Sequence, residues 1–448
     1  MKWVNRKGEQ SMKRKAFIIS LLLLFVVSAT GCSKTGQNEE NSNNNPNAPL
    51  KFSTEPVTLT MYTDIPEQLF EETINQQVKK KYPFITLQQV YNKGQISELV
   101  LSGNVPDLIH TPIGTRAFPY TDQNLFEDLM PLIKKHQFDV NRIDDTILAT
   151  SRAVFEGKTL ALPFATNNTS LYYNKSIFDR FGVAYPRDGM SWDETVELAT
   201  KMTRVDNGVQ YRGFHFQPKI LAEYNQLSLS SVDGKTEKSL VNSDGWKQYF
   251  DMMKRFYVIQ GNQLDESTYS TAVDLFLKKQ TLAMIAVQNI IPSINAAEKT
   301  GFTWDMVTMP SLPSRPGTLH QMIASGLAIS TTSKYKDQAF MVIEQILSDD
   351  VQNFRHTTLA SPAVLKNLKK DDFGKNFALT KGQNITALIK HKFAAPQPFF
   401  TRYDQKALVI VDNKFKDVVI RNKDTNTALR EAEEEINKMI EQEKTTKK

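Results

Sequence analysis

The sequence predicts an α/β fold in which strands and helices alternate around doubly wound sheets. Residues 57–62 (VTLTMY) alternate apolar and polar side chains, as a strand with one buried face does. Residues 66–81 then place apolar side chains at helical spacing, and residues 85–91 alternate again. A second region of alternating helices and strands begins near Asn174. Ligands of such sheets bind at the carboxyl ends of the strands, so the loops that follow the strands are the expected binding region.

The first region closes with two further elements. A short helix over residues 95–102 ends at Gly103, and an apolar strand begins at Pro106. Three strands with two intervening helices within residues 57–109 predict a parallel sheet.

The second region carries clear helix boundaries. A helix over residues 174–181 is closed by Gly182, and Ser191 with Glu194 forms a capping box that opens the next helix. Ser333 is expected to cap a later helix. The remaining predicted elements are helices at 246–257, 270–279 and 427–443 and strands at 281–287, 302–309 and 326–330.

Charge is unevenly distributed along the 448 residues. The formal net charge is +6, from 55 Lys and Arg against 49 Asp and Glu. Six basic residues and one acidic residue lie before Cys32, so the remainder carries a net charge of only +1. A body with so little excess positive charge is not expected to bind nucleic acid through a broad cationic face. The single cysteine also excludes an intramolecular disulfide.

The first 31 residues have the organisation of an export signal. A basic triplet at residues 13–15 precedes an apolar run over residues 16–27, broken only by Ser20, and small residues follow. This run is too short to span a bilayer, which needs about 20 residues. We therefore expect residues 1–31 to be a cleaved signal peptide, whether translation starts at Met1 or at Met12.

The end of this segment resembles the lipobox of bacterial lipoproteins. The motif is ATGC at residues 29–32, with Ala29 where Leu is most common. The resemblance implies that Cys32 receives a diacylglyceryl group and becomes the mature N-terminus; the alternative is a plain secreted protein in which Cys32 is incidental. Residues 32–56 are rich in Asn, Ser and Pro and are expected to form a flexible tether between the anchor and the globular body.

Six short motifs follow one another along the body. They are residues 103–109 (GNVPDLI), 157–164 (GKTLALPF), 171–183 (LYYNKSIFDRFGV), 186–194 (PRDGMSWDE), 283–284 (AM) and 333–352. Together they resemble the family 1 extracellular solute-binding proteins of bacterial ABC importers, the group of maltose-binding protein and many oligosaccharide receptors. The likeness extends over about residues 57–443 and is greatest to the lipoprotein receptors of Gram-positive bacteria.

The resemblance implies a two-lobed fold of the type II periplasmic-binding-protein class, closing on its ligand like a hinged clamp. Residues 57–163 plus about 310–360 would form lobe 1, and residues 167–305 plus about 361–448 would form lobe 2. The implied protein is a monomeric, non-enzymatic receptor without cofactor or metal. It would be lipid-anchored at the outer face of the cell membrane and would deliver a solute, expected to be an oligosaccharide, to importer permease subunits.

The family's ligand contacts lie in the loops after the strands and in the crossing strand. Carboxylates, carboxamides and aromatic rings at those positions suit the hydroxyl groups and C–H faces of sugars. Ile290 and Ile291 occupy the place of a stacking tryptophan in the maltose-binding relative, so stacking would have to come from other aromatic residues. The candidate contacts are Tyr62, Asp64, Thr111, Asn167, Gln288 and Asn289, with Tyr224 and Phe399 as candidate stacking aromatics.

Other function classes find less support. The S-x-x-K at residues 333–336 and the K-T-G at residues 299–301 stand in the reverse of the order found in penicillin-recognising serine enzymes. The six histidines show no metal-ligand spacing, and the phosphate-binding motif of transport ATPases is missing. A glycosidase carboxylate pair far apart in the sequence stays open, as does a sensory or structural lipoprotein without a transporter.

Overall fold

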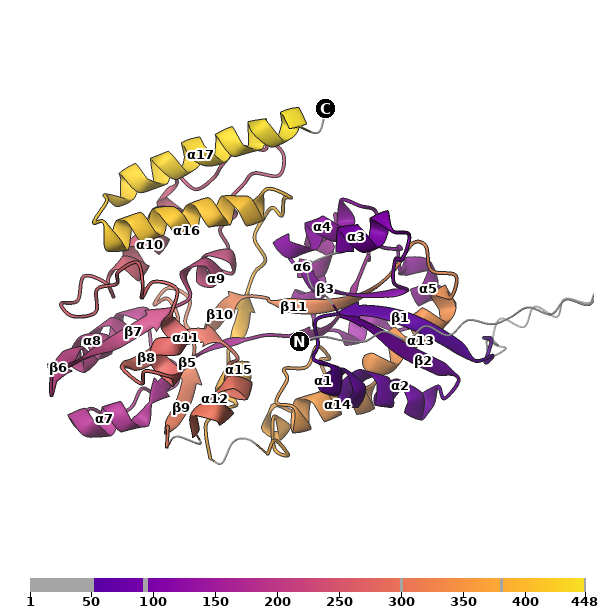
Figure 1. The fold of residues 1–448 in the computed structure, drawn as a ribbon, viewed down its shortest axis with the longest axis horizontal. Helices are drawn as coiled ribbons and strands as arrows, with labels where there is room; N and C mark the ends of the chain where they lie inside the picture. The colour runs from indigo at the N-terminus through magenta and orange to yellow at the C-terminus, as the bar shows by residue number, and fades with distance from the viewer. Residues whose placement is uncertain (1–51, 92–95, 299–300, 379–381, 447–448) are drawn as a thin grey trace, which may run out of the picture. The chain divides into compact units, whose positions relative to one another are not determined.

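The computed structural model describes residues 52–91, 96–298, 301–378 and 382–446. The predicted leader and Cys32 lie outside the described residues. Within these residues, two five-stranded sheets each organise a hydrophobic core, which we call the first and the second lobe (Figure 1). In the described part of the chain, no helix is both long and apolar enough to cross a membrane.

The sheet of the first lobe has the strand order β2-β1-β3-β11-β4. β1 (Val57–Thr63) pairs in parallel with β2 (Ile85–Tyr91) and β3 (Leu108–Ile113), as predicted. β11 (Ala324–Ile329), which was not among the three strands predicted to be parallel, runs antiparallel to β3 and to β4 (Leu162–Thr166), so the complete sheet is mixed. The chain enters β11 on its return from the second lobe, which gives this strand the opposite direction.

Helices cover both sides of the first sheet. The helices are α1 (Glu67–Phe70), η1 (Glu71–Asn75), α2 (Gln76–Lys81), α3 (Ile96–Leu101), η2 (Thr115–Ala117), α4 (Phe118–Thr121), α5 (Met130–Lys135), η3 (Val140–Arg142), α6 (Asp145–Val154), α13 (Lys336–Ile346) and α14 (Asp349–Thr358). The stretch predicted at 66–81 is helical from Glu67 onward and contains the π-helical turn η1. α2, α13 and α14 lie on one side of the sheet, and α3, α4 and α6 lie on the other (Figure 1).

The expected cap of α13 is wrong. The helix begins at Lys336, with Tyr335 rather than Ser333 at the cap position. The Ser333 hydroxyl instead donates to Asp107 Oδ1 at 2.7 Å and accepts the backbone N–H of Tyr335 at 3.2 Å. Ser333 therefore ties the loop before α13 to the start of β3.

The sheet of the second lobe is also mixed. Its order is β6-β7-β8-β5-β9, with β7 parallel to β8 and β5 antiparallel to both β8 and β9. The strands are β5 (Thr169–Asn174), β6 (Arg204–Asp206), β7 (Val209–Phe216), β8 (Leu282–Gln288) and β9 (Trp304–Thr308).

The predicted helix signals of the second lobe are confirmed. Gly182 closes α7 (Lys175–Phe181) in the left-handed conformation, and Ser191 and Glu194 form the capping box of α8 (Trp192–Met202). The other helices are α9 (Pro218–Glu223), α10 (Asp244–Lys254), α11 (Ala272–Leu277), α12 (Ile291–Glu298), α15 (Ala387–Lys390), α16 (Asp404–Ile420) and α17 (Thr425–Thr446), together with the short η4 (Lys370–Asp372).

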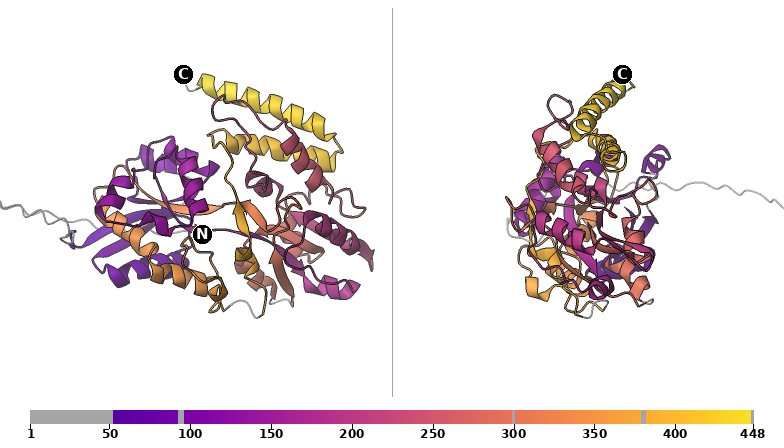
Figure 2. Two further views of the ribbon diagram at one scale, coloured as in Figure 1. Left: turned by 180° about the vertical axis from the view of Figure 1, so that it is seen from behind. Right: turned by 90° about the vertical axis from the view of Figure 1, so that its left-hand side faces the viewer.

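The last two long helices pack side by side on the second lobe (Figures 1 and 2). α17 buries the predicted stripe of Leu429, Ala432, Ile436 and Ile440, each at most 1% exposed. Apolar residues of α16, among them Ala407 and Val411, belong to the same core.

The chain passes between the two lobes at more than one point. β4 of the first sheet leads directly into β5 of the second. Leu319 packs in the second core while Met322 packs in the first, and a two-stranded sheet of β10 (Thr318–Gln321) and β12 (Lys392–Ala394) lies at this passage. The exact residues that divide the chain into lobes stay a prediction.

Candidate ligand-binding site

The carboxyl end of β1 brings the polar residues Thr63 and Asp64 beside His110 of β3 in the first lobe. Asp64 Oδ1 lies 3.2 Å from His110 Nδ1, and Thr63 Oγ1 lies 2.9 Å from the same nitrogen. The hydrogen bond with His110 lowers the pKa of Asp64. The Asp64 side chain is 69% exposed, so this predicted contact is available to a ligand.

The crossing from β4 to β5 presents a second polar group. Asn167 is exposed, and its Oδ1 accepts the backbone N–H of Asn289 at 3.3 Å. Asn289 Oδ1 in turn accepts the N–H of Ile291 at the start of α12, and the preceding Gln288 is the last residue of β8 and pairs with Thr169. Three predicted contacts therefore lie together where the crossing strand meets the end of β8.

A pocket lies where the two lobes meet. Gly114 and Thr115 come from the turn after β3 in the first lobe, while Glu223 and Tyr224 come from the end of α9 in the second. Its lining side chains leave only about 10 Å³ of room, roughly enough for one water molecule. Its lining residues are Gly114, Thr115, Thr150, Glu223, Tyr224, Gln321, Met322, Gln397 and Phe400.

The Glu223 carboxylate links the lobes across this pocket. Its Oε1 accepts the Thr115 hydroxyl at 2.9 Å, and Arg116 donates from Nε to Oε1 at 3.2 Å and from Nη2 to Oε2 at 2.7 Å. The Glu223 side chain is only 1% exposed. Burial alone would lower the pKa of Arg116, but the hydrogen bond and the charge of Glu223 outweigh burial and raise it.

Gln405, in the first turn of α16, completes this cluster. Its Nε2 lies 2.6 Å from Thr115 Oγ1 and 2.8 Å from Glu223 Oε1. The four residues Thr115, Arg116, Glu223 and Gln405, which we call the interlobe cluster, were not predicted from the sequence. The local signal that was available is that Thr115 and Arg116 directly follow the end of a parallel strand.

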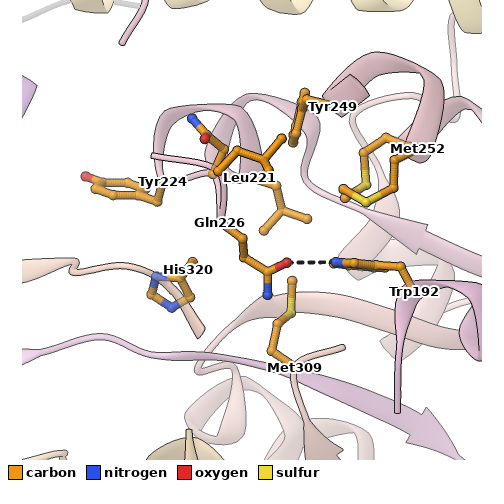
Figure 3. Close-up of a pocket in the computed structure, with 11 residues that line it drawn as sticks. Trp192, Leu221, Tyr224, Gln226, Tyr249, Met252, Met309 and His320 are labelled. Carbon is orange, nitrogen blue, oxygen red and sulfur yellow. Dashed lines mark hydrogen bonds between the residues drawn. The ribbon is translucent and has the colours of Figure 1, made fainter. Parts of the chain in front are cut away.

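A second, mostly apolar pocket lies beside this cluster within the second lobe (Figure 3). Gln226 Oε1 accepts the indole N–H of Trp192 at 2.8 Å, and Gln226 Nε2 donates to the carbonyls of Pro310 and Thr318. All three hydrogen bonds of the Gln226 side chain are made to other groups of the protein, and Trp192 is 1% exposed. Trp192 therefore has a structural role at this pocket.

His320 borders the same pocket as a neutral ring (Figure 3). Its Nε2 accepts the backbone N–H of Thr169 at 2.9 Å, and its Nδ1 donates to the carbonyl of Gln321. Burial lowers the pKa of His320 to about 4. The ring therefore joins the start of β5 to β10 without carrying charge.

Four predicted contacts are not part of the polar groups at the ends of β1 and β8. Tyr62 lies within β1 and is 1% exposed, and Thr111 is fully buried with its hydroxyl on the carbonyl of Pro112. The backbone of Phe399 is fixed by the Ser230 hydroxyl, while its neighbour Phe400 lines the interlobe pocket. Tyr224 alone of these lines the pocket, and burial raises its pKa well above the usual value. As ligand contacts, all eight residues stay predictions.

Metal binding finds no support in the described ranges. Among them, His, Cys, Asp and Glu side chains form no group of three or more with the arrangement of a metal site. The groups at the candidate site are hydroxyls, carboxamides, a carboxylate–guanidinium pair and aromatic rings, which suit an organic ligand with many hydrogen-bonding groups.

Comparison with known sequences gives a family. Residues 85–381 match the family described as bacterial extracellular solute-binding protein. A binding protein of Brucella abortus (strain 2308) is 22% identical over 261 residues, which are 57% of this chain and 62% of the relative. The chain thus matches less than two thirds of the length of this curated relative.

Solved structures share the fold at low sequence identity. An ABC substrate-binding protein of Listeria monocytogenes in complex with cycloalternan has a TM-score of 0.69 at 19% identity, over 86% of this chain and 99% of the other. The maltose/maltodextrin-binding domain of Bdellovibrio bacteriovorus bound to maltotriose gives 0.62 at 17% identity, over 86% and 100%. A Mycobacterium tuberculosis protein in complex with glycerophosphocholine gives 0.67 at 14% identity, over 86% and 99%.

These findings confirm both the predicted two-lobed α/β fold and the predicted family. The family match covers more than half of the chain and spans parts of both lobes. The family consists of proteins that bind solutes rather than convert them. This chain belongs to the bacterial extracellular solute-binding proteins.

Proposed function

We propose that the protein is the receptor of a bacterial ABC importer and that its cargo is an oligosaccharide. The observation that carries the proposal is the interlobe pocket, in which hydroxyl, carboxamide and carboxylate groups of both lobes stand beside Tyr224 and Phe400. Such a mixture suits the alternating hydroxyl groups and C–H faces of sugars. The fold neighbours from Listeria and Bdellovibrio bind cycloalternan and maltotriose, which supports this class of cargo.

Capture is proposed to occur by closure of the lobes about the crossing strands. Oligosaccharides need more room than the pocket offers between the lobes as they stand, since ligand pockets typically hold roughly 300–1,000 Å³. The lobes therefore part to admit cargo and close over it, and the cargo favours closure only by its higher affinity for the closed state. Permease subunits would then recognise the closed form.

The proposed location is the outer face of the cell membrane of a Gram-positive bacterium. The support is the lipobox-like ATGC motif, in which Cys32 is the only cysteine of the chain. Two or more acyl chains on Cys32 would anchor the protein stably, whereas one would not. Replacing Cys32 by Ser should release the protein into the medium or block its processing; a correctly processed, membrane-retained product would refute the anchor.

The cargo is tested by thermal-shift screening followed by calorimetry. The panel contains mono- and oligosaccharides, glycerophosphocholine and a buffer blank. A stoichiometric complex with an unmodified oligosaccharide supports the proposal. If only glycerophosphocholine binds, the cargo is not an oligosaccharide. If shorter sugars are released from the incubated ligand, the protein is an enzyme instead.

Asn167 provides the residue-level test of this proposal. Asn167→Ala removes a carboxamide that is exposed at the crossing strand. If Asn167 contacts the cargo, affinity should fall by about 1–3 kcal/mol because a polar partner is left unpaired. Calorimetry measures the change, and the exposed Asn141 on η3, replaced in the same way, serves as the control. An unchanged dissociation constant would remove Asn167 from the site.

A further inference from the structure

The last turn of α14 contains a buried arginine without an acidic partner. Arg355 is 9% exposed, and its Nη2 donates to the Ser361 hydroxyl at 3.2 Å. Its guanidinium carbon lies 5.1 Å from the ring centroid of Phe164 in β4. Among the described residues, no carboxylate lies within ion-pair distance of it. Burial lowers the pKa of Arg355 to about 10, with no neighbouring charge to offset the effect.

This arrangement differs from that of Arg116 in the interlobe cluster. Arg116 is more exposed and meets the Glu223 carboxylate through two hydrogen bonds. Arg355 has instead one hydroxyl, one aromatic face and the C-terminal end of its own helix. These contacts compensate a buried charge only in part, because burying an ion without a counter-charge is costly.

The surroundings of Arg355 connect two passages of the chain. Phe164 belongs to β4, which leads into the crossing to the second lobe, and its carbonyl accepts the Gln352 amide at 3.0 Å. Ser361 lies beside Pro362, whose carbonyl faces the N–H of Thr166 at 3.5 Å. A ligand held by Arg355 would therefore contact the segments on which movement of the lobes depends.

The site retains unused donors. Arg355 carries five N–H donors, of which the described contacts use one. Arg355 keeps 9% of its surface exposed, so the residue is not wholly sealed from solvent. The Ser361 hydroxyl accepts from Arg355, which leaves its own hydrogen free to donate. The planar guanidinium fork matches two oxygens of an oxyanion or carboxylate.

We propose that Arg355 and Ser361 form an anion site at the junction of α14, β4 and the passage at Ser361. Its ligand is a group with two or more acceptor oxygens, such as phosphate or a carboxylate. The anion supplies the counter-charge that the described protein groups do not provide. The source is either a free oxyanion or the acidic group of a sugar, and the site does not depend on the cargo proposed above.

The first test is a titration of the full chain with inorganic phosphate at constant ionic strength and pH, followed by thermal unfolding. A saturable rise in Tm is expected for the natural sequence. Arg355→Met, which keeps a similar volume without charge, should weaken the apparent affinity at least tenfold. Arg152→Met on α6 removes an exposed arginine and should leave the response unchanged. An Arg355→Met variant with the full response, or a natural protein that responds saturably to neither phosphate nor galacturonate, would overturn the proposal.

A second variant covers the case in which Arg355→Met does not fold. Arg355→Lys keeps the charge but loses the two-pronged geometry, so phosphate affinity should fall several-fold, measured by ³¹P line broadening. If Arg355→Lys and the natural protein bind phosphate with equal affinity, the proposed site is wrong.

Galacturonate and galactose identify the source of the anion. An Arg355-dependent response to galacturonate and not to galactose assigns the site to the acidic group of a cargo. A response to phosphate without one to galacturonate assigns it to a free oxyanion, and a response to neither contradicts the proposal.

Discussion

At the scale of single residues, His320 makes stability depend on pH. Its folded-state pKa of about 4 lies below the unfolded value of about 6.5, so the unfolded chain takes up a proton first. The unfolding free energy should therefore fall as pH drops from about 6.5 to about 4, by about 3 kcal/mol. His320→Gln should reduce the fall in the unfolding free energy between pH 7.5 and pH 4, measured by urea denaturation. His215 is also buried with its pKa lowered to about 4, so the variant should still lose the stability that depends on His215. If the unfolding free energy depends on pH in the same way in the variant and in the natural protein, the assignment to His320 is wrong.

Asp404 should make stability depend on pH in the opposite direction. Burial raises its pKa to about 7, although the Ser231 hydroxyl and the Thr401 N–H both donate to it. The folded protein binds the proton more tightly than the unfolded chain, so stability should fall as pH rises from about 4 to about 7, by about 4 kcal/mol. Asp404→Asn should remove this decrease, so that the unfolding free energy rises more steeply with pH in the same urea titrations. A profile that stays parallel to that of the natural protein would show that Asp404 does not titrate in this range.

At the scale of elements, Gly213 allows α8 to pack on β7. A Cβ at this position would stand 2.0 Å from the carbonyl oxygen of Ala199, and a helix backbone cannot move aside cheaply. Gly213→Ala should lower the unfolding free energy by about 3 kcal/mol or more, measured by urea denaturation. Gly245→Ala is the control, because its Cβ would meet the end of the flexible Leu229 side chain at 2.6 Å and should cost much less. Equal losses in the two variants would refute the argument.

Elements with signals in neighbouring residues were predictable. The capping box of Ser191 and Glu194 lies within four residues, and the buried stripe of α17 repeats at helical spacing. The direction of β11 was not predictable in this way, because it depends on the chain's return from the second lobe. The π-helical turn η1 was likewise missed, since its residues share the apolar spacing of the flanking α-helical turns.

At the scale of the whole molecule, the candidate site depends on contacts between distant residues. Arg116 and Glu223 are 107 positions apart, and Thr115 and Gln405 are 290 apart. No local pattern pairs such residues, so the sequence alone indicated only loops at the ends of strands. The family resemblance indicated Tyr224, and the adjacent Glu223 makes the contact between the lobes.

The interlobe cluster should influence how far the lobes separate. Arg116 of the first lobe makes two hydrogen bonds to Glu223 of the second, and the carboxylate is 1% exposed whereas Arg116 is 42% exposed. Solvent therefore screens part of the pairing, and we expect Arg116→Gln to weaken the closed arrangement by about 1–2 kcal/mol. Such a change shifts the ratio of closed to open molecules by roughly 5- to 30-fold.

Energy transfer between labels on the two lobes measures this shift. With Cys32 replaced by Ser, the chain has no other cysteine, so cysteines placed at the exposed Lys158 and Lys201 take one label in each lobe. Arg116→Gln should change the transfer efficiency toward that of more separated lobes in the absence of cargo. Arg187→Gln removes an exposed pair with Glu194 inside the second lobe and should leave it unaltered. If both variants give the efficiency of the natural protein, the Arg116–Glu223 pair does not hold the lobes together, and other contacts between the lobes, such as the Arg402–Asp122 ion pair, must do so.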